Sequence, residues 1–105
     1  MATARIEYLG ELRTKCTHLA SGTEIVTDAP VDNKGRGQAF SPTDLVATAL
    51  GSCMVSIMGI KSKDLNVDLK DSTVSITKIM QSEPRKIAKI EVILNMSIEI
   101  SEKNK

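Results

Sequence analysis

The chain has few large side chains with which to fill a core. Its aromatic residues are one tyrosine, Tyr8, and one phenylalanine, Phe40, and it has no tryptophan. The core must therefore be built from isoleucine, valine, leucine, methionine and alanine. A chain of 105 residues buries only roughly 60–70% of its unfolded surface. We expect a single domain over residues 1–105 with a thin core that association between chains would extend.

An excess of charge of either sign is also missing. Lysine and arginine number 14, aspartate and glutamate 13, and the net charge is +1. No basic field exists to attract phosphate backbones or anionic lipid. The N-terminus lacks a signal pattern, and no apolar run approaches the length of a membrane span. We expect a cytoplasmic protein with no nucleic-acid or membrane partner.

Cysteine is scarce too, since only Cys16 and Cys53 are present. Two cysteines do not make a disulfide framework, and these are not in a Cys-x-x-Cys spacing, so both are expected to be free thiols. Cys16 and His18 could lie on one strand face, but two ligands are too few for a metal site. Residues 33–37 could cradle an anion, yet they match no phosphate-binding pattern, and a solvated loop is the favoured interpretation. No metal or cofactor is expected.

The first 40 residues predict extended structure joined by turns. Even spacing of apolar residues over 4–17 indicates one long strand with a bulge at Gly10. A turn is predicted at 21–22, followed by a β-branched strand over 24–27. Proline, glycine and polar residues then make 28–40 a loop.

A long helix is predicted to follow this loop. Ser41 is suited to the N-cap, Pro42 to the first helical position, and Asp44 completes a variant of the capping box. Apolar residues then occupy almost the whole circumference up to Ile60, which predicts burial on most sides. A stripe of small residues would let a second helix approach closely; it consists of Thr48, Ser52, Ser56 and Gly59.

The last part of the chain predicts a β-hairpin. Strands are expected over 73–81 and 86–100 around Pro84, and the second alternates strictly between apolar and polar residues. Its apolar positions are Ala88, Ile90, Val92, Leu94, Met96, Ile98 and Ile100. That face needs a cover, which the central helix can supply. The sequence thus predicts an α+β fold of antiparallel sheets packed around a long helix.

Cys53 is the residue on which any chemistry depends. It shares a helix side with apolar residues, and apolar burial favours the neutral, inert thiol. The helix N-terminus lies about three turns away, too far for its dipole to stabilise a thiolate. A reactive Cys53 therefore needs a cation from elsewhere in the fold. From the residues alone, a structural cysteine and a nucleophile both remain open.

Two sequence segments resemble the OsmC/Ohr family of small thiol peroxidases. They are Phe40-Ser41-Pro42-Thr43-Asp44-Leu45 and Ala49-Leu50-Gly51-Ser52-Cys53-Met54, supported by Ser21-Gly22-Thr23-Glu24-Ile25 and Thr27-Asp28-Ala29-Pro30. The resemblance extends over about residues 5–100 in element order. It implies an intertwined homodimer with two central helices between six-stranded sheets. It also implies that Cys53 attacks an organic hydroperoxide and becomes a sulfenic acid.

The resemblance also implies which residue supplies the cation that a reactive Cys53 needs. The activating arginine of the family lies nine positions before the glycine that matches Gly22, which is Arg13 here. The acidic residue that orients this arginine in the Ohr branch corresponds to Thr43, which carries no charge, and Asp44 faces a different direction. The second, resolving cysteine of the family lies on a later helix, and this chain ends before it.

Two hypotheses follow from these observations. In the first, the chain reduces hydroperoxides through Cys53 and Arg13, without a cofactor, and an external thiol restores Cys53. In the second, it is a non-catalytic dimeric α+β module that binds a small apolar ligand or a partner, and Cys53 is structural.

Overall fold

The computed structural model describes residues 2–31, 34–97 and 99–100. The chain divides into two compact units, Met1–Leu45 and Val46–Lys105, and each is described by itself. Helix α1 (Pro42–Asp64) begins at the end of the first unit.

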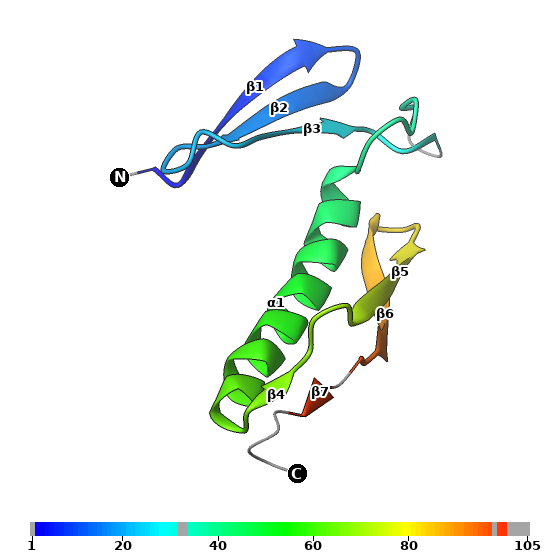
Figure 1. Cartoon of the computed structure of the whole chain (residues 1–105). Helices are drawn as coiled ribbons and strands as arrows, with labels where there is room; N and C mark the ends of the chain where they lie inside the picture. The colour runs from blue at the N-terminus through cyan, green and yellow to red at the C-terminus, as the bar shows by residue number, and fades with distance from the viewer. Residues whose placement is uncertain (1, 32–33, 98, 101–105) are drawn as a thin grey trace. The chain divides into compact units, whose positions relative to one another are not determined.

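The first unit contains a three-stranded antiparallel sheet in the order β1-β2-β3 (Figure 1). The strands are β1 (Ala4–Gly10), β2 (Arg13–His18) and β3 (Glu24–Asp28). The predicted turn at 21–22 and the strand after it are confirmed, with Gly22 at a φ of 79°. The prediction of one long strand over 4–17 is wrong, because the chain reverses direction between β1 and β2.

A tight turn at Glu11 and Leu12 causes this reversal. Their φ angles are 55° and 65°, and two consecutive residues with positive φ match the twist of a hairpin. Such turns usually carry asparagine, aspartate or glycine, and Glu11 and Leu12 are of other types. The local signal is Gly10, where the strand register shifts as predicted. The turn makes Arg13 the first residue of the central strand.

Helix α1 begins with the predicted cap. The Asp44 amide donates to Ser41 Oγ over 3.1 Å, and the Ser41 amide donates to Asp44 Oδ2 over 3.0 Å. This reciprocal pair is a capping box, in which each side chain satisfies an N–H that the helix leaves free. The helix extends over 23 residues to Asp64, as the sequence predicts.

The expected burial of α1 on most sides is wrong for the single chain. Only Ala47 and Gly51 are buried among its residues. By length and composition α1 is also apolar enough to cross a membrane, with 11% of that window buried, so the expectation that no run reaches such a length is corrected. One helix of this kind is weak evidence for a membrane span, because the core helix of a soluble protein has the same properties.

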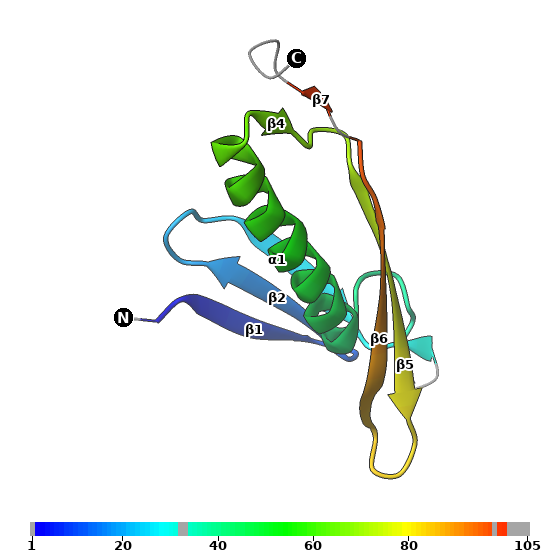
Figure 2. The same cartoon turned by 90° about the horizontal axis from the view of Figure 1, so that it is seen from below.

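The second unit contains the predicted hairpin, formed by β5 (Thr73–Gln81) and β6 (Lys86–Asn95) (Figure 2). The inner face of β5 contacts α1 at Gly51, where a Cβ would lie 2.6 Å from Ile76 Cδ1. The α+β class is therefore confirmed, with the helix as one cover of this hairpin.

The second hairpin strand differs from its prediction in length and phase. It ends at Asn95, and a separate strand β7 (Glu99–Ile100) pairs with β4 (Val67–Asp68). A register shift next to Ile79 pairs Met80 with Ile87. This bulge leaves Ala88 exposed and turns Ile87 inward, so the apolar face begins one residue earlier. The predicted strand position Ile98 and residues 101–105 lie outside the described residues.

Candidate functional site

Cys53 lies on α1 in the second unit and is exposed. Four apolar residues share its side of the helix, at spacings of four, three, four and three along the stripe, which places them on one face. They are Val46 (58% exposed), Leu50 (43%), Ile57 (50%) and Ile60 (69%). The neighbours of Cys53 are thus apolar as the sequence predicts, but the burial expected for this cysteine is wrong for the single chain. We call these four residues and Cys53 the cysteine stripe.

Arg13 lies in the first unit and is held by a buried carboxylate. Strand register places Arg13 directly opposite Asp28, the last residue of β3. Arg13 Nε lies 3.7 Å from Asp28 Oδ2, and the Asp28 side chain is 0% exposed whereas that of Arg13 is 32% exposed. An arginine next to a carboxylate that water does not reach is restricted in orientation.

Gln38 connects the two charged residues. Arg13 Nη2 donates to Gln38 Oε1 over 3.1 Å, and the Gln38 amide donates to Asp28 Oδ2 over 3.0 Å. The three residues form a closed ring, in which the backbone of Gln38 anchors the carboxylate and its side chain anchors the guanidinium.

The loop between β3 and α1 holds this ring in place. The Asp28 amide donates to the Phe40 carbonyl over 3.0 Å, and the Ala29 amide donates to the Leu12 carbonyl over 3.2 Å. The loop residue Arg36 also forms an ion pair with Glu11 in the hairpin turn. The turn and the loop thus meet on both sides of Arg13.

Two buried atoms of the ring lack a hydrogen-bond partner in the part of the chain that the structure describes. They are Arg13 Nε and Asp28 Oδ1. A buried carboxylate oxygen without a donor is costly unless a nearby cation compensates its charge. Arg13 is that cation, so the pairing is electrostatic rather than a direct hydrogen bond.

The helix start does not supply the acidic partner. Asp44 is engaged in the cap with Ser41, and the Thr43 hydroxyl shares a hydrogen bond of 3.2 Å with Ser41 Oγ. Sequence reasoning missed Asp28. Its place opposite Arg13 depends on the turn at residues 11–12, and the alternation of apolar residues did not reveal that turn.

Cys16 occupies the middle of the central strand β2, opposite Ile6 on one side and Ile25 on the other. It is half-buried, and its Sγ lies 3.7 Å from Thr14 Oγ1. The His18 ring instead shares a hydrogen bond of 2.6 Å with Ser21 Oγ. Within residues 2–31, 34–97 and 99–100, no group of three or more histidine, cysteine, aspartate or glutamate residues could hold a metal ion.

Two amides of the glycine-rich loop are used in hydrogen bonds within the first unit. The Gly35 amide donates to the Pro30 carbonyl over 2.9 Å, and the Gly37 amide donates to the Ala29 carbonyl over 3.2 Å. Since these two N–H groups are used within the loop, they cannot form the anion cradle considered above.

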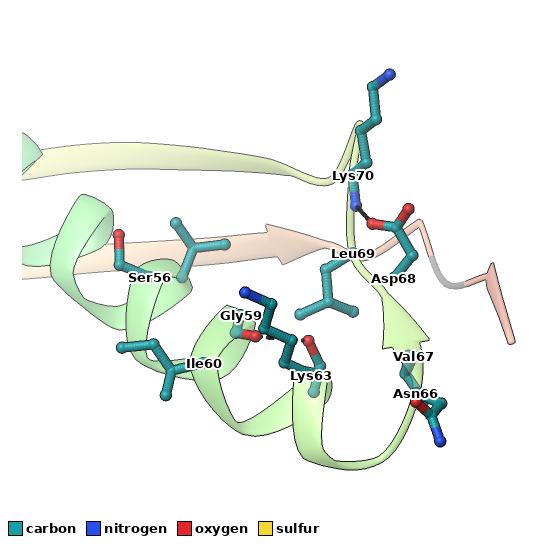
Figure 3. A pocket seen from close by; sticks show the side chains of 11 residues that line it. Ser56, Gly59, Ile60, Lys63, Asn66, Val67, Asp68, Leu69 and Lys70 are labelled. Carbon is teal, nitrogen blue, oxygen red and sulfur yellow. Dashed lines mark hydrogen bonds between the residues drawn. The ribbon is translucent and has the colours of Figure 1, made fainter. Parts of the chain in front are cut away.

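A groove of about 930 Å³ lies in the second unit, between the end of α1 and the segment that follows it (Figure 3). Ile60, Val67 and Leu69 contribute apolar surface, and Lys63 and Lys70 add positive charge. The Lys70 amide donates to Asp68 Oδ1 over 2.8 Å, which shapes the far wall. Cys53 is not a lining residue of this groove.

Comparison with known proteins places these features in context. A family model described as OsmC-like protein matches residues 35–105. The chain is 46% identical to a Psychrobacter arcticus protein of known crystal structure, described as a candidate osmotic stress induced and detoxification response protein. That match covers 99% of this chain and 76% of the other, with a TM-score of 0.91. No curated protein matches the chain.

Proposed function

The chain belongs to the family of OsmC-like proteins, and from this premise we propose that it reduces organic hydroperoxides with Cys53 as the nucleophile. The observation that carries the proposal is the place of Cys53, exposed in the middle of the cysteine stripe. A structural cysteine is usually among the most buried residues of a chain. The apolar neighbours would contact the organic part of the peroxide, and the role would be detoxification under stress, as described for the Psychrobacter arcticus protein.

The reaction needs a thiolate and a proton. The Cys53 thiolate attacks the distal oxygen of ROOH, the S–O bond forms and the O–O bond breaks. The leaving alkoxide takes up a proton and departs as ROH, while Cys53 becomes a sulfenic acid. One external thiol then converts the sulfenic acid to a mixed disulfide with release of water. A second external thiol releases Cys53 as a thiol and is itself oxidised to a disulfide.

We assign the activating cation to Arg13. A guanidinium remains charged at every physiological pH, and a cation next to a thiol favours the thiolate. Arg13 is supported in this role by its match to the arginine of the family and by its attachment to a buried carboxylate. Arg13 would also polarise the peroxide oxygen that leaves.

Further parts of the proposal concern assembly and environment. The exposed large hydrophobic residues favour a homodimer, because large apolar side chains at this exposure favour burial against another chain. Such a contact would bury part of the cysteine stripe and leave Cys53 open to the hydroperoxide. No metal or organic cofactor enters the reaction, and the partners are the hydroperoxide and a thiol reductant. We propose a cytoplasmic location, where thiol reductants are maintained.

The proposal is tested by hydroperoxide consumption with two matched variants. Cumene hydroperoxide and dithiothreitol serve as substrate and reductant. We expect Cys53→Ser to abolish turnover and the sulfenic acid adduct with dimedone, while Cys16→Ser retains both. Full turnover in Cys53→Ser would overturn the proposal, as would loss of turnover in Cys16→Ser alone.

One observation favours the second hypothesis, a binding module. The groove near the end of α1 is large enough for a small apolar ligand. If binding there is the function, the apolar probe 1-anilinonaphthalene-8-sulfonate should bind to wild type and to Cys53→Ser alike. The substitution Leu69→Lys, which charges the groove, should then abolish binding while peroxide consumption stays absent in all variants.

A further inference from the structure

We infer that Asp28 is the positioning residue of Arg13, and that it does from the end of β3 what the acidic residue at the helix start does in the Ohr branch. This inference rests on the proposed function of Arg13. It concerns orientation alone, since Asp28 is 0% exposed and is not assigned any contact with the substrate.

The ring of Arg13, Asp28 and Gln38 holds one edge of the guanidinium. Asp28 Oδ2 faces Arg13 Nε, and Gln38 Oε1 accepts from Arg13 Nη2. No hydrogen bond among the described residues uses Arg13 Nη1. One edge of the guanidinium is therefore held by the protein, and the remaining nitrogen is left to meet a thiolate or a peroxide oxygen.

Lys15, the other cation of β2, is held differently from Arg13. Lys15 lies within 3.6 Å of Glu7 and 3.9 Å of Glu24, but these carboxylates are 58% and 54% exposed. Exposed pairs are screened by water and hold a side chain weakly. The Asp28 side chain is 0% exposed, so water does not screen its charge next to Arg13.

The hydrogen bond between Asp28 and the loop does not require a charged side chain. The Gln38 amide needs one acceptor oxygen, and an asparagine could provide it. Asp28 Oδ1 has no donor among the described residues, so the second oxygen serves no hydrogen bond there. The charge of this side chain is explained by Arg13, because a buried anion needs a nearby cation.

The test compares three variants of the full chain. Asp28→Asn removes the charge and keeps an acceptor for the Gln38 amide, and Asp28→Glu restores the charge. Glu24→Gln removes an exposed carboxylate from the same strand and serves as the control. The first measurement is the solvent exchange rate of the Arg13 Nε–H, observed by ¹⁵N NMR and assigned through its loss in Arg13→Lys. The second is the rate of hydroperoxide reduction.

We expect Asp28→Asn to accelerate exchange of the Arg13 Nε–H and to slow hydroperoxide reduction, each by about tenfold, which corresponds to losing about 1.4 kcal/mol of interaction. Asp28→Glu should recover part of both, and Glu24→Gln should change neither. If Asp28→Asn fails to fold, Gln38→Leu replaces it. Gln38 is exposed. Gln38→Leu removes the side-chain oxygen that accepts from Arg13 Nη2 but keeps the backbone amide that donates to Asp28 Oδ2. We expect the same acceleration of Arg13 Nε–H exchange.

The two ideas fail in distinguishable ways. An unchanged Arg13 Nε–H exchange rate in Asp28→Asn, or equal effects from Glu24→Gln, overturns the positioning role whatever the enzyme does. If exchange accelerates while wild type consumes no peroxide, the positioning role stands and the proposed function of the chain fails. If exchange accelerates and an active enzyme keeps its full rate, Asp28 orients Arg13 but does not serve the reaction, which overturns the part of the inference that equates Asp28 with the acidic residue of the Ohr branch.

Discussion

At the scale of single residues, Gly51 allows a close approach between α1 and the hairpin. A Cβ at this position would lie 2.6 Å from Ile76 Cδ1 and 3.2 Å from Val74 Cγ1. Gly51→Ala gains about 1 kcal/mol of helix propensity, but overpacking costs about 1–3 kcal/mol. We expect a net loss of about 1 kcal/mol in the free energy of unfolding, measured by urea denaturation.

A double-mutant cycle separates the packing part of this loss. Ile76→Val removes Cδ1, the nearest atom, at a cost of about 0.5–1.5 kcal/mol on its own. In that background Gly51→Ala should be neutral or stabilising. The double mutant should therefore be about 1 kcal/mol more stable than the sum of the two single changes predicts. Strictly additive effects would mean that Ile76 does not limit the space at Gly51.

Among the residues of the candidate site, some could be predicted from the sequence and others could not. Cys53 and its apolar neighbours at helical spacing are predicted from the sequence, but the exposure of Cys53 is not, because an apolar stripe on a helix normally predicts burial. The partner of Arg13 could not be predicted. A register shift or a turn changes every cross-strand pair, including that of Arg13. Glu11 and Leu12, which form the turn, are not residue types typical of a tight hairpin turn.

At the scale of secondary-structure elements, the start of α1 is the feature that local chemistry specifies most strongly. The capping box of Ser41 and Asp44 was predicted from residue types alone and is confirmed by hydrogen bonds in both directions. Caps depend on neighbours within one turn, so the sequence contains the whole signal. The end of β6 depends instead on the pairing of β7 with β4, a long-range contact that alternation of residues does not encode.

The cap predicts a measurable loss of stability. Ser41 is 1% exposed, and Ser41→Ala removes the acceptor of the Asp44 amide inside a protected environment. We expect a loss of about 1–2 kcal/mol in the free energy of unfolding, as measured by urea denaturation. Ser52→Ala, in the exposed middle of the same helix, is the matched control and should stay within about 0.5 kcal/mol of wild type. Equal losses in both variants would argue against the cap.

At the scale of the whole molecule, the exposure of apolar residues is the dominant property. Ala47 is the one buried hydrophobic residue among those described, whereas the exposed large hydrophobic residues include Ile6, Tyr8, Ile57 and Ile60. A single domain normally has a contiguous buried core that offsets the conformational entropy lost on folding. The thin core expected from the composition is therefore confirmed, and we expect a second copy of the chain to cover part of the exposed apolar surface.

This argument predicts that the cysteine stripe mediates self-association. Ile57→Glu and Ile93→Glu place the same charge at sites of similar exposure in the single chain, 50% and 58%. Ile93 lies on the outer face of β6, with the polar residues Glu91 and Asn95 at neighbouring positions of the same parity. If association buries the stripe, Ile57→Glu desolvates a charge at the contact and costs several kcal/mol, whereas Ile93→Glu leaves the contact intact.

Sedimentation velocity at micromolar concentration should give a dimer for wild type and Ile93→Glu, and a monomer or an unfolded chain for Ile57→Glu. A stable, well-folded monomer of wild type would contradict the prediction, and an unchanged dimer of Ile57→Glu would exclude the stripe from its interface.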